Sequence, residues 1–319
     1  MERVYINCIL CGKKSQRIEW VENEFIGMRC DCGLLYVSPR PSFDEILNLY
    51  ISDERIVNSK SRDNAEFASR LTSRHRLRLI RKYIGQGSLL EIGSADGYVL
   101  DESRRVGFEP YGVELNPHQA NFTKKQLGIP VETNPFSESS FCGICFDVIC
   151  HFDVISHFYD PVSEFKKFNK RLKNPGVLCF ETGNGGDLSK WWLRFIGRLQ
   201  YPHHLFLFSK KNIEQLCKQT GFEIIALHRY SIFFQIGAIK LVQWLRKHLK
   251  EMFPKKEKNT VLQGLHEFPR RYSPKRELFL KFLILMSFII RYKIGKILPK
   301  IGPQTVIYVA KKTSAIDSK

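Results

Sequence analysis

Short apolar runs alternate with amphipathic stretches from residue 88 to near the end of the chain, and this alternation restricts the fold more than any other feature. Strands that alternate with helices indicate an α/β fold with a largely parallel sheet. We therefore expect a sheet of seven strands with helices on both faces. The runs of strand length, separated by glycine and proline, are SLLEIG, PYGVEL, IPVET, FDVICHF, GVLCFET, FEIIALHRY and QTVIYVAKK.

The first of these strands leads into a glycine turn and a helix in LLEIGSADGYVL, residues 89–100. Turns of this kind often hold phosphates at the helix N-terminus. A P-loop would need Gly-Lys-Ser/Thr, and a dinucleotide fingerprint would need three glycines, whereas only Gly93 and Gly97 are present here. Glu91 precedes the turn, and its charge would repel a phosphate. The turn is therefore not expected to hold a phosphate.

Polar residues follow the next strands at regular places. Glu114 and Leu115, in YGVELNP, end the second strand, and Glu114 lies 21 residues after Gly93. A carboxylate at this position can accept hydrogen bonds from both hydroxyls of a ribose. Later segments offer Thr133 and Asn134 in VETNPF, His151 and Phe152 in FDVICHFDVISHFYDP, and the lead RLKNPGVLCFETGN into the fifth strand.

In this order and spacing the segments resemble the motifs of class I S-adenosylmethionine (SAM) methyltransferases. The resemblance covers about residues 89–230 and resumes at the final strand. It implies a Rossmann-like seven-stranded sheet and SAM as cofactor, and Ala95 replaces a glycine that is common in the family. The cofactor contacts that it implies are Glu91, Gly93, Ala95, Gly97, Glu114, Leu115, Asn134, His151 and Phe152.

Four cysteines near the N-terminus have the spacing of a metal site. Cys8, Cys11, Cys30 and Cys32 form C-x2-C-x18-C-x-C, and two such thiolate pairs indicate a tetrahedral zinc ribbon. The segment CGLLYVSPRPSFDEILNLY resembles the zinc-ribbon leader of many bacterial methyltransferases in cell-surface polysaccharide or secondary-metabolite pathways. We predict a structural zinc ion, and the alternative is a degenerate ribbon that holds no metal.

The remaining cysteines do not form a second site of this kind. Cys142 and Cys145 make a C-x-x-C with no other pair nearby, and we expect ordinary thiols. Cys150, Cys179 and Cys217 fall on apolar faces and are predicted to be core residues. The start MERVYINCILCG lacks the apolar run of a secretory signal, so we expect a cytoplasmic protein with thiols rather than disulfides.

Candidate acceptor-site residues come from two segments. Methyl transfer needs positioning of the reactants, and a base when the acceptor is a hydroxyl. The best-placed ionisable groups are Asp153, His157 and the pair His203-His204. YPHHLFLFS resembles the Glu-His-Leu segment of sugar-modifying methyltransferases, which implies that His204 lies at the acceptor.

His204 and His157 are therefore the predicted catalytic residues, and each has an alternative. His204 could instead cap the helix that begins near Ser209 and pack on Phe206. His157 could instead hold neighbouring groups in place without touching the substrate.

A basic segment separates the last two strands. Residues 231–303 contain 16 Lys and Arg against four acids, a net charge of +12 out of the +18 of the whole chain. Its apolar residues have helical spacing, but the apolar run between Lys281 and Arg291 is nine residues long, too short to span a bilayer. We expect either in-plane helices on an anionic membrane surface or a helical lid over the substrate cleft, and the two are compatible.

These patterns divide the chain into a zinc-ribbon-like module (1–40), a helical leader (41–87), a SAM-binding core (88–230), a basic amphipathic insertion (231–303) and a last strand with a tail (304–319). The expected function is methyl transfer to a sugar or other small or lipid-linked metabolite, in the cytoplasm or at the inner membrane face. One alternative is an RNA methyltransferase, but HFDVISHF replaces the Asn/Asp-Pro-Pro-aromatic signature of many base-methylating enzymes, so nucleic acid is not expected as a partner. Another is a non-catalytic binding protein with the same fold.

Overall fold

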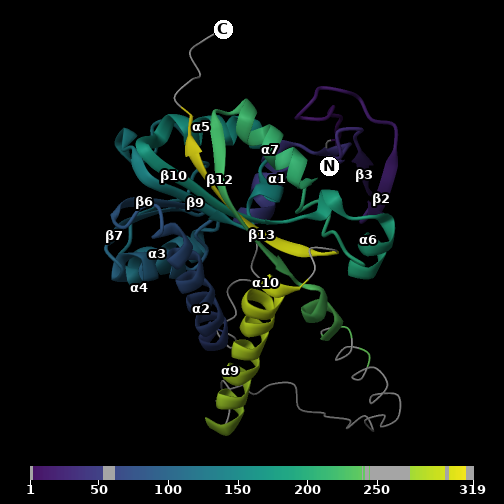
Figure 1. The fold of residues 1–319 in the computed structure, drawn as a ribbon. Coiled ribbons are helices and arrows are strands. Elements are labelled where there is room, and N and C mark those ends of the chain that lie inside the picture. The colour runs from purple at the N-terminus through teal and green to yellow at the C-terminus, as the bar shows by residue number, and fades with distance from the viewer. Residues whose placement is uncertain are drawn as a thin grey trace, which may run out of the picture.

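The computed structural model describes residues 3–52, 62–238, 240, 244, 274–298 and 302–313. Its centre is a seven-stranded sheet with the order β12-β13-β10-β9-β6-β7-β8 (Figure 1). Each of the seven predicted runs overlaps one of these strands, which confirms the predicted α/β fold. The strands are β6 (Gly87–Ile92), β7 (Phe108–Val113), β8 (Val131–Glu132), β9 (Phe146–Phe152), β10 (Leu172–Gly183), β12 (Phe222–Ser231) and β13 (Gln304–Lys312).

The strand directions bring the ends of several strands together. β6 runs parallel to β7 and β9, and β9 runs parallel to β10. The carboxyl ends of parallel strands share one edge of a sheet, where ligands bind in open α/β folds. The residues that follow β6, β7 and β9 therefore converge at this edge. β13 is antiparallel to both β10 and β12 and lies between them.

Helices cover both faces of the sheet and bury two hydrophobic cores (Figure 1). Alternate residues of a strand point to opposite faces, so Val148 and Cys150 of β9 enter the core with α2 and α3, while Ile149 enters the core with α5 and α7. These helices and α4 are α2 (Arg62–Ile80), α3 (Tyr98–Arg105), α4 (Pro117–Leu127), α5 (Pro161–Arg171) and α7 (Lys210–Gln219).

The N-terminal segment forms a second, four-stranded sheet with the order β11-β4-β3-β2. Its edge strand β11 (Phe206–Leu207) comes from the predicted core, and Phe206 pairs with Tyr36 of β4. The leader sheet is therefore joined to the segment that immediately follows His204. The other leader elements are β1 (Arg3–Val4), β2 (Ile18–Glu22), β3 (Phe25–Arg29), β4 (Leu35–Val37), β5 (Arg40–Pro41) and α1 (Phe43–Ile51).

The described part of the basic insertion is mostly helical. It contains α9 (Pro274–Ile289), the π-helical turn η6 (Ile290–Ile294) and the short α10 (Gly295–Ile297), and α9 extends away from the sheet (Figure 1). Most of residues 231–253, the first part of the insertion with apolar residues at helical spacing, lie outside the described residues. Among the residues that the structure describes, no helix combines the length and apolarity needed to cross a membrane. Shorter elements elsewhere are η3 (Ser140–Gly143), η4 (Ile155–His157), η5 (Gly185–Asp187) and α6 (Lys190–Ile196).

Candidate functional site

The glycine turn between β6 and α3 has the backbone geometry that its sequence predicts. Gly93 and Gly97 have φ angles of +71° and +74°, in the left-handed region that favours glycine. A Cβ at Gly93 would lie 2.7 Å from a methyl carbon of Val154, so a side chain would not fit without a shift. Ala95 also has a positive φ, +47°, but its side chain is exposed. The turn therefore tolerates alanine at the position where the family commonly has glycine.

Glu114 is fixed at the end of β7 by backbone amides. Its Oε2 accepts a hydrogen bond from the N–H of Ala95 at 2.7 Å, and its Oε1 accepts one from the N–H of Asn116 at 2.8 Å. Burial raises the pKa of Glu114, and the hydrogen bonds from these two amides oppose the rise. The glycine turn and the predicted ribose-binding carboxylate are thus one hydrogen-bonded unit.

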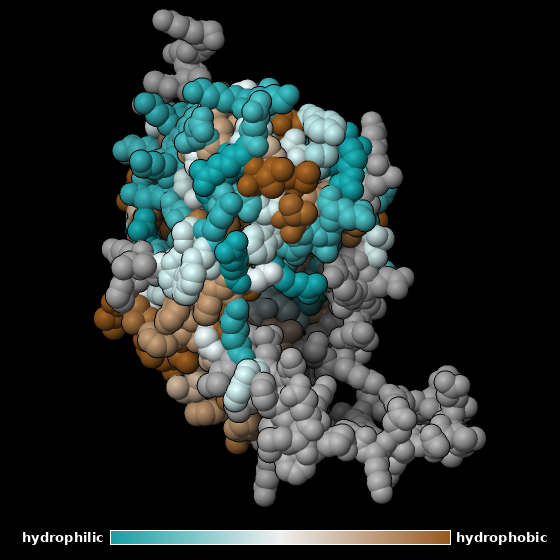
Figure 2. Space-filling view, turned by 90° about the vertical axis from the view of Figure 1, so that its right-hand side faces the viewer, coloured by the Kyte–Doolittle hydropathy of each residue, from teal (hydrophilic) through white to brown (hydrophobic). Residues whose placement is uncertain are grey.

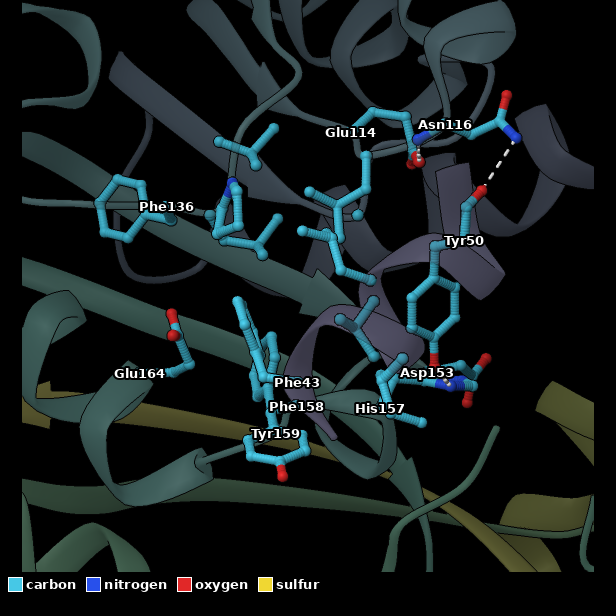
Figure 3. Close-up of a pocket in the computed structure, with 18 of the residues that line it drawn as sticks. Phe43, Tyr50, Glu114, Asn116, Phe136, Asp153, His157, Phe158, Tyr159 and Glu164 are labelled. Atoms are coloured by element: carbon cyan, nitrogen blue, oxygen red, sulfur yellow. Dashed lines mark hydrogen bonds between the residues drawn. The ribbon is translucent and has the colours of Figure 1, made fainter. Parts of the chain in front are cut away.

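A cavity of about 300 Å³ opens beside this unit (Figure 3). Gly93, Glu114 and Leu115 line it as predicted, and α1 covers it with Phe43 and Tyr50. A carboxylate with two acceptor oxygens suits a vicinal diol, and the apolar wall suits an aromatic base. The residues present therefore fit SAM. The wall is formed by Phe43, Ile46, Leu47, Ile92, Val113, Leu115, Pro135, Phe136, Val154 and Phe158.

Three predicted cofactor residues take supporting places. Gly97 lies under α4, where a Cβ would be 2.5 Å from a side-chain carbon of Thr123. Phe152 is buried, with the Arg76 guanidinium 4.2 Å from its ring centre. Ala95 supplies its N–H to Glu114. None of these three side chains lines the cavity.

Asn134 departs from the prediction because the loop after β8 turns outward. Its side chain is exposed and belongs to a separate surface pocket. The next two residues, Pro135 and Phe136, line the first cavity, whereas Asn134 does not.

Glu91 also departs from the prediction, and strand alternation explains why. Ile92 lines the cavity, so the preceding side chain points to the opposite face of β6. Glu91 is 4% exposed, its Oε2 has no hydrogen-bond partner, and burial raises the pKa of its carboxyl well above the ordinary value. Burial therefore disfavours the charged form of this carboxyl, and its side chain does not line the cavity.

His151 is a core residue rather than a cofactor contact. It is fully buried, neither ring nitrogen has a hydrogen-bond partner, and burial lowers its pKa to about 3. The imidazole is therefore neutral in the folded protein. The aromatic rings around it are those of Phe158, Phe165, Phe168 and Phe180.

A second cavity of about 400 Å³ shares Asp153 and His157 with the first. It is built from segments that are far apart in the sequence. Besides these two residues its polar and charged lining consists of Ser156, Thr182, Asn184, Arg198, Gln200, His204, Arg291, Gln304 and Thr305.

The predicted catalytic His157 is held by several neighbours. Its Nδ1 lies 2.9 Å from the Tyr50 hydroxyl and 2.9 Å from the His203 carbonyl oxygen (Figure 3). Burial lowers the pKa of His157 to about 4. These contacts tie η4 to α1 and to the loop before β11, and they favour the alternative in which His157 positions its neighbours.

His204 lines the second cavity, as predicted for a residue at the acceptor. Its ring lies edge-on to His157 at 4.6 Å, and burial lowers its pKa to about 4. Helix α7 is capped by Ser209 and Asn212 in a capping box, so the alternative role of His204 as its cap is wrong. The catalytic roles of His204 and His157 stay predictions.

Sequence reasoning missed several residues of the site. Asp153 was noted as ionisable but was not assigned a role, although it follows β9 by one residue. Asn116 and Gln119 also line the first cavity. The position of Asn116 two residues after Glu114, in ELNP, could have indicated that it lies at this site. Nothing in the local sequence indicated that Tyr50 or Arg291 would enter a cavity.

The four leader cysteines come together as predicted. All of their sulfur atoms lie within 4.8 Å of one another, and Cys8 and Cys32 have an Sγ–Sγ distance of 3.5 Å. Four sulfurs about 2.3 Å from a tetrahedral zinc ion would be roughly 3.8 Å apart, so the cluster fits one ion. Burial raises the pKa of Cys8 and that of Cys30, which reaches about 11, so a cation is needed to hold them as thiolates. Among the described residues this is the one cluster with such geometry.

The other cysteines lie as expected. Cys142 and Cys145 are exposed free thiols, whereas Cys150, Cys179 and Cys217 are buried.

Comparison with known families agrees with this geometry. Residues 64–227, just over half of the chain, match the family described as a methyltransferase domain. The chain belongs to the class I SAM-dependent methyltransferases. Its cofactor is SAM, and the cavity lined by Gly93, Glu114 and the apolar wall is the candidate site for it. No curated protein matches the sequence.

Several solved structures are similar to this methyltransferase. A protein described as a sarcosine dimethylglycine methyltransferase from Galdieria sulphuraria is 16% identical, with a TM-score of 0.49 over 78% of this chain and 86% of that chain. The cyclopropane synthase MmaA2 from Mycobacterium tuberculosis is 18% identical, with a TM-score of 0.45 over 75% and 83%. A phosphoethanolamine N-methyltransferase from Haemonchus contortus is 17% identical, with a TM-score of 0.45 over 88% and 62%.

Proposed function

We propose that the protein transfers the methyl group of SAM to a sugar or to another small or lipid-linked metabolite bound in the second cavity. The observation that carries this proposal is the meeting of two cavities at Asp153 and His157. Transfer in line between two bound molecules requires neighbouring sites that share a boundary. The first cavity is hereafter called the cofactor cavity and the second the acceptor cavity.

This chain's residues hold and orient the reactants. Glu114 accepts hydrogen bonds from the ribose, and Gly93 lets the backbone approach the ligand closely. When bound, SAM supplies an electrophilic methyl group. Asp153 and His157 form the boundary across which the acceptor atom must approach.

The lining of the acceptor cavity supports a hydroxyl-rich acceptor. Amide side chains of Asn184, Gln200 and Gln304 offer both donors and acceptors of hydrogen bonds. The volume of about 400 Å³ is within the range of small-molecule sites. Arg198 adds a cation at this cavity, which suits an acceptor that also carries a phosphate or carboxylate.

Calorimetry with SAM and methyl uptake from labelled SAM test the proposal together. We expect saturable binding of SAM, and label transfer to at least one member of a panel of nucleotide sugars and lipid-linked sugars. Glu114→Ala should weaken both signals strongly. Binding without transfer to any of these acceptors would contradict a sugar acceptor, and absence of binding would favour a non-catalytic protein. Salt-dependent methylation of RNA would support the RNA methyltransferase instead.

Exposed apolar side chains on α9 support the lipid-linked form of the acceptor. Leu278, Phe279 and Phe282 are 71%, 59% and 53% exposed. Hydrophobic residues gather at the lower edge of the molecule in Figure 2, the level to which α9 extends in Figure 1. Lys293 and Lys296 are exposed in the segment that follows. An exposed apolar helix face with basic neighbours suits the interface of an anionic membrane.

Flotation with vesicles tests this membrane contact. The intact protein should float with vesicles that contain anionic lipid and less well with neutral ones, and salt should weaken the binding. Replacing Leu278, Phe279 and Phe282 by serine should reduce flotation while leaving SAM binding unchanged. An intact protein that does not float, or a serine variant that floats equally well, would contradict the contact.

A further inference from the structure

Asp153 occupies a special place in the molecule because it lines both cavities. It follows β9 directly, and its N–H donates a hydrogen bond to the Glu181 carbonyl oxygen at 3.0 Å. This bond extends the pairing of β9 with β10 by one residue. Glu114 and Glu164, the other acids of the cofactor cavity, do not line the acceptor cavity. Among the described residues, Asp153 is thus the carboxylate located where a transferred methyl group must pass.

The backbone at Asp153 is held in an uncommon conformation. Its φ angle is +60°, in the left-handed region that most residues with a side chain avoid. Asp and Asn are the non-glycine residues that adopt it most readily. Strain of this kind persists where the surrounding structure over-determines it, and it is frequent at active sites. The side chain of Asp153 is 59% exposed and lines both cavities.

Two arginines lie near Asp153 but are already engaged by Glu181. The Nε of Arg76 binds Glu181 Oε2 at 2.9 Å, and Nη2 of Arg291 binds Glu181 Oε1 at 2.8 Å. Among the residues that the structure describes, the ion pair of Asp153 is a longer contact of 3.6 Å with Nη2 of Arg76. Its carboxylate therefore keeps oxygen atoms available for a ligand.

The charged and titratable neighbours come from every element around this position. Arg76 belongs to α2, Glu181 to β10, Arg291 to η6 and His157 to η4. Enclosure by the protein raises the pKa of Asp153 to about 6, Glu181 adds to the rise, and Arg76 and Arg291 oppose it. Tyr292 of η6 also faces this group, and burial keeps its hydroxyl protonated.

We propose that Asp153 is the general base that removes the proton from the acceptor hydroxyl during methyl transfer. This assignment rests on the proposed function. As the acceptor oxygen bonds to the methyl carbon, the carbon–sulfur bond breaks and its electron pair stays on sulfur. The hydroxyl proton moves to a carboxylate oxygen of Asp153, and water later takes it up.

The two histidines are less suited to this role. Both have pKa values lowered to about 4, so each imidazole is a weak proton acceptor at neutral pH. His157 is moreover engaged through Nδ1 by Tyr50 and the His203 carbonyl. A base is most effective when its pKa is near the working pH, which favours the carboxylate.

Carboxyl carbon NMR of protein labelled in its aspartates tests the placement without an acceptor. One signal should titrate near pH 6 and be missing from Asp153→Asn, which keeps the size and the preferred backbone conformation of the residue. SAM should move this titration to lower pH than S-adenosylhomocysteine does, because only SAM carries a positive sulfur. Titration near pH 4, or equal shifts with both ligands, would overturn the proposal.

Calorimetry on the same variants gives a second readout. Asp153→Asn should shift the ratio of SAM to S-adenosylhomocysteine affinity about tenfold toward the neutral ligand. Glu109→Gln, which removes an exposed acid that lines neither cavity, should leave the ratio unchanged. With any nucleotide sugar that accepts label in the screen above, Asp153→Asn should lower turnover about a hundredfold and remove the rise in rate through pH 6.

The outcomes separate the two proposals. Absence of SAM binding to the unaltered protein would overturn the proposed function and the base together. SAM binding with an unshifted Asp153 signal, or full turnover by Asp153→Asn, would overturn only the base.

Discussion

The cofactor cavity and the acceptor cavity meet at two residues, but they are assembled in different ways. The cofactor cavity is formed mainly by strand ends and turns between residues 92 and 164, with α1 as a cover. The acceptor cavity combines residues 153–157, 182–207, 232, 291 and 303–305. The first follows largely from local sequence with one helix of the leader packed over it, and the second requires residues of the core, the insertion and the last strand to come together.

The leader is the clearest example of this difference. β4 pairs with β11, and the N–H of Val37 donates to the carbonyl oxygen of Leu205, next to His204. The side chain of Asn212 in α7 also donates to the carbonyl oxygen of Cys32 at 2.9 Å. Damage to the cysteine cluster should therefore affect the acceptor side before the cofactor side.

The largest expected effect is on the cofactor cavity alone. Glu114→Ala removes the two acceptors of the ribose hydroxyls, and cofactor affinity should fall about a hundredfold, because hydrogen bonds to a charged group contribute about 1.5–3 kcal/mol each. Calorimetry with S-adenosylhomocysteine measures it. Glu109→Ala, at an exposed position of the same strand, is the matched control and should bind normally. Equal affinities for the two variants would show that the ribose lies elsewhere.

The next effect should appear on the acceptor side. Cys11→Ser should release zinc, loosen β4 and β11, and lower turnover on the order of thirtyfold while affinity for S-adenosylhomocysteine stays within about twofold. Metal analysis, turnover with labelled SAM and calorimetry give the three readouts. Cys142→Ser alters an exposed thiol outside the cluster and should change none of them. If Cys11→Ser also lost affinity for S-adenosylhomocysteine, the cysteine cluster would support both cavities and not the acceptor cavity alone.

A smaller effect is expected from His204→Asn. The variant should lose about tenfold in turnover through poorer acceptor positioning, and it should keep its cofactor affinity because His204 lines only the acceptor cavity. His118→Asn, on an exposed position of α4, serves as control. Unchanged turnover would remove His204 from the acceptor site.

The smallest effect concerns the core that supports both cavities. His151 is buried without hydrogen bonds, and its pKa is about 3, below the ordinary value of 6.5. The unfolded chain therefore takes up a proton first as the pH falls, so stability is lost from about pH 6.5 toward pH 3.

His151→Leu should remove this loss and raise the free energy of unfolding by about 1 kcal/mol at pH 7. Urea unfolding at pH 7 and pH 5 measures both changes, and the gain should be larger at pH 5. A variant that is less stable than the natural chain at both values would indicate a hidden partner for the imidazole.

How far the sequence predicts the structure depends on how local each signal is. The seven strands, the glycine turn and Glu114 follow from alternation, from the φ angles that only glycine adopts easily, and from fixed spacing. The cysteine cluster follows from ligand spacing. The misplaced residues have local causes: strand alternation turns Glu91 to the face opposite Ile92, whereas His151 is enclosed by the aromatic rings of the core. Asp153, Tyr50 and Arg291 meet through tertiary packing, for which the chain carries no short-range signal.

The position of β13 has a consequence for how the molecule is made. Residues 304–312 insert between two strands that were synthesised earlier, and they pair with both. Until these last residues leave the ribosome, β10 and β12 have no partner between them and the edge of each is open. A nascent chain therefore has an unfinished sheet while the basic insertion is translated, and open strand edges can pair with other chains during this interval.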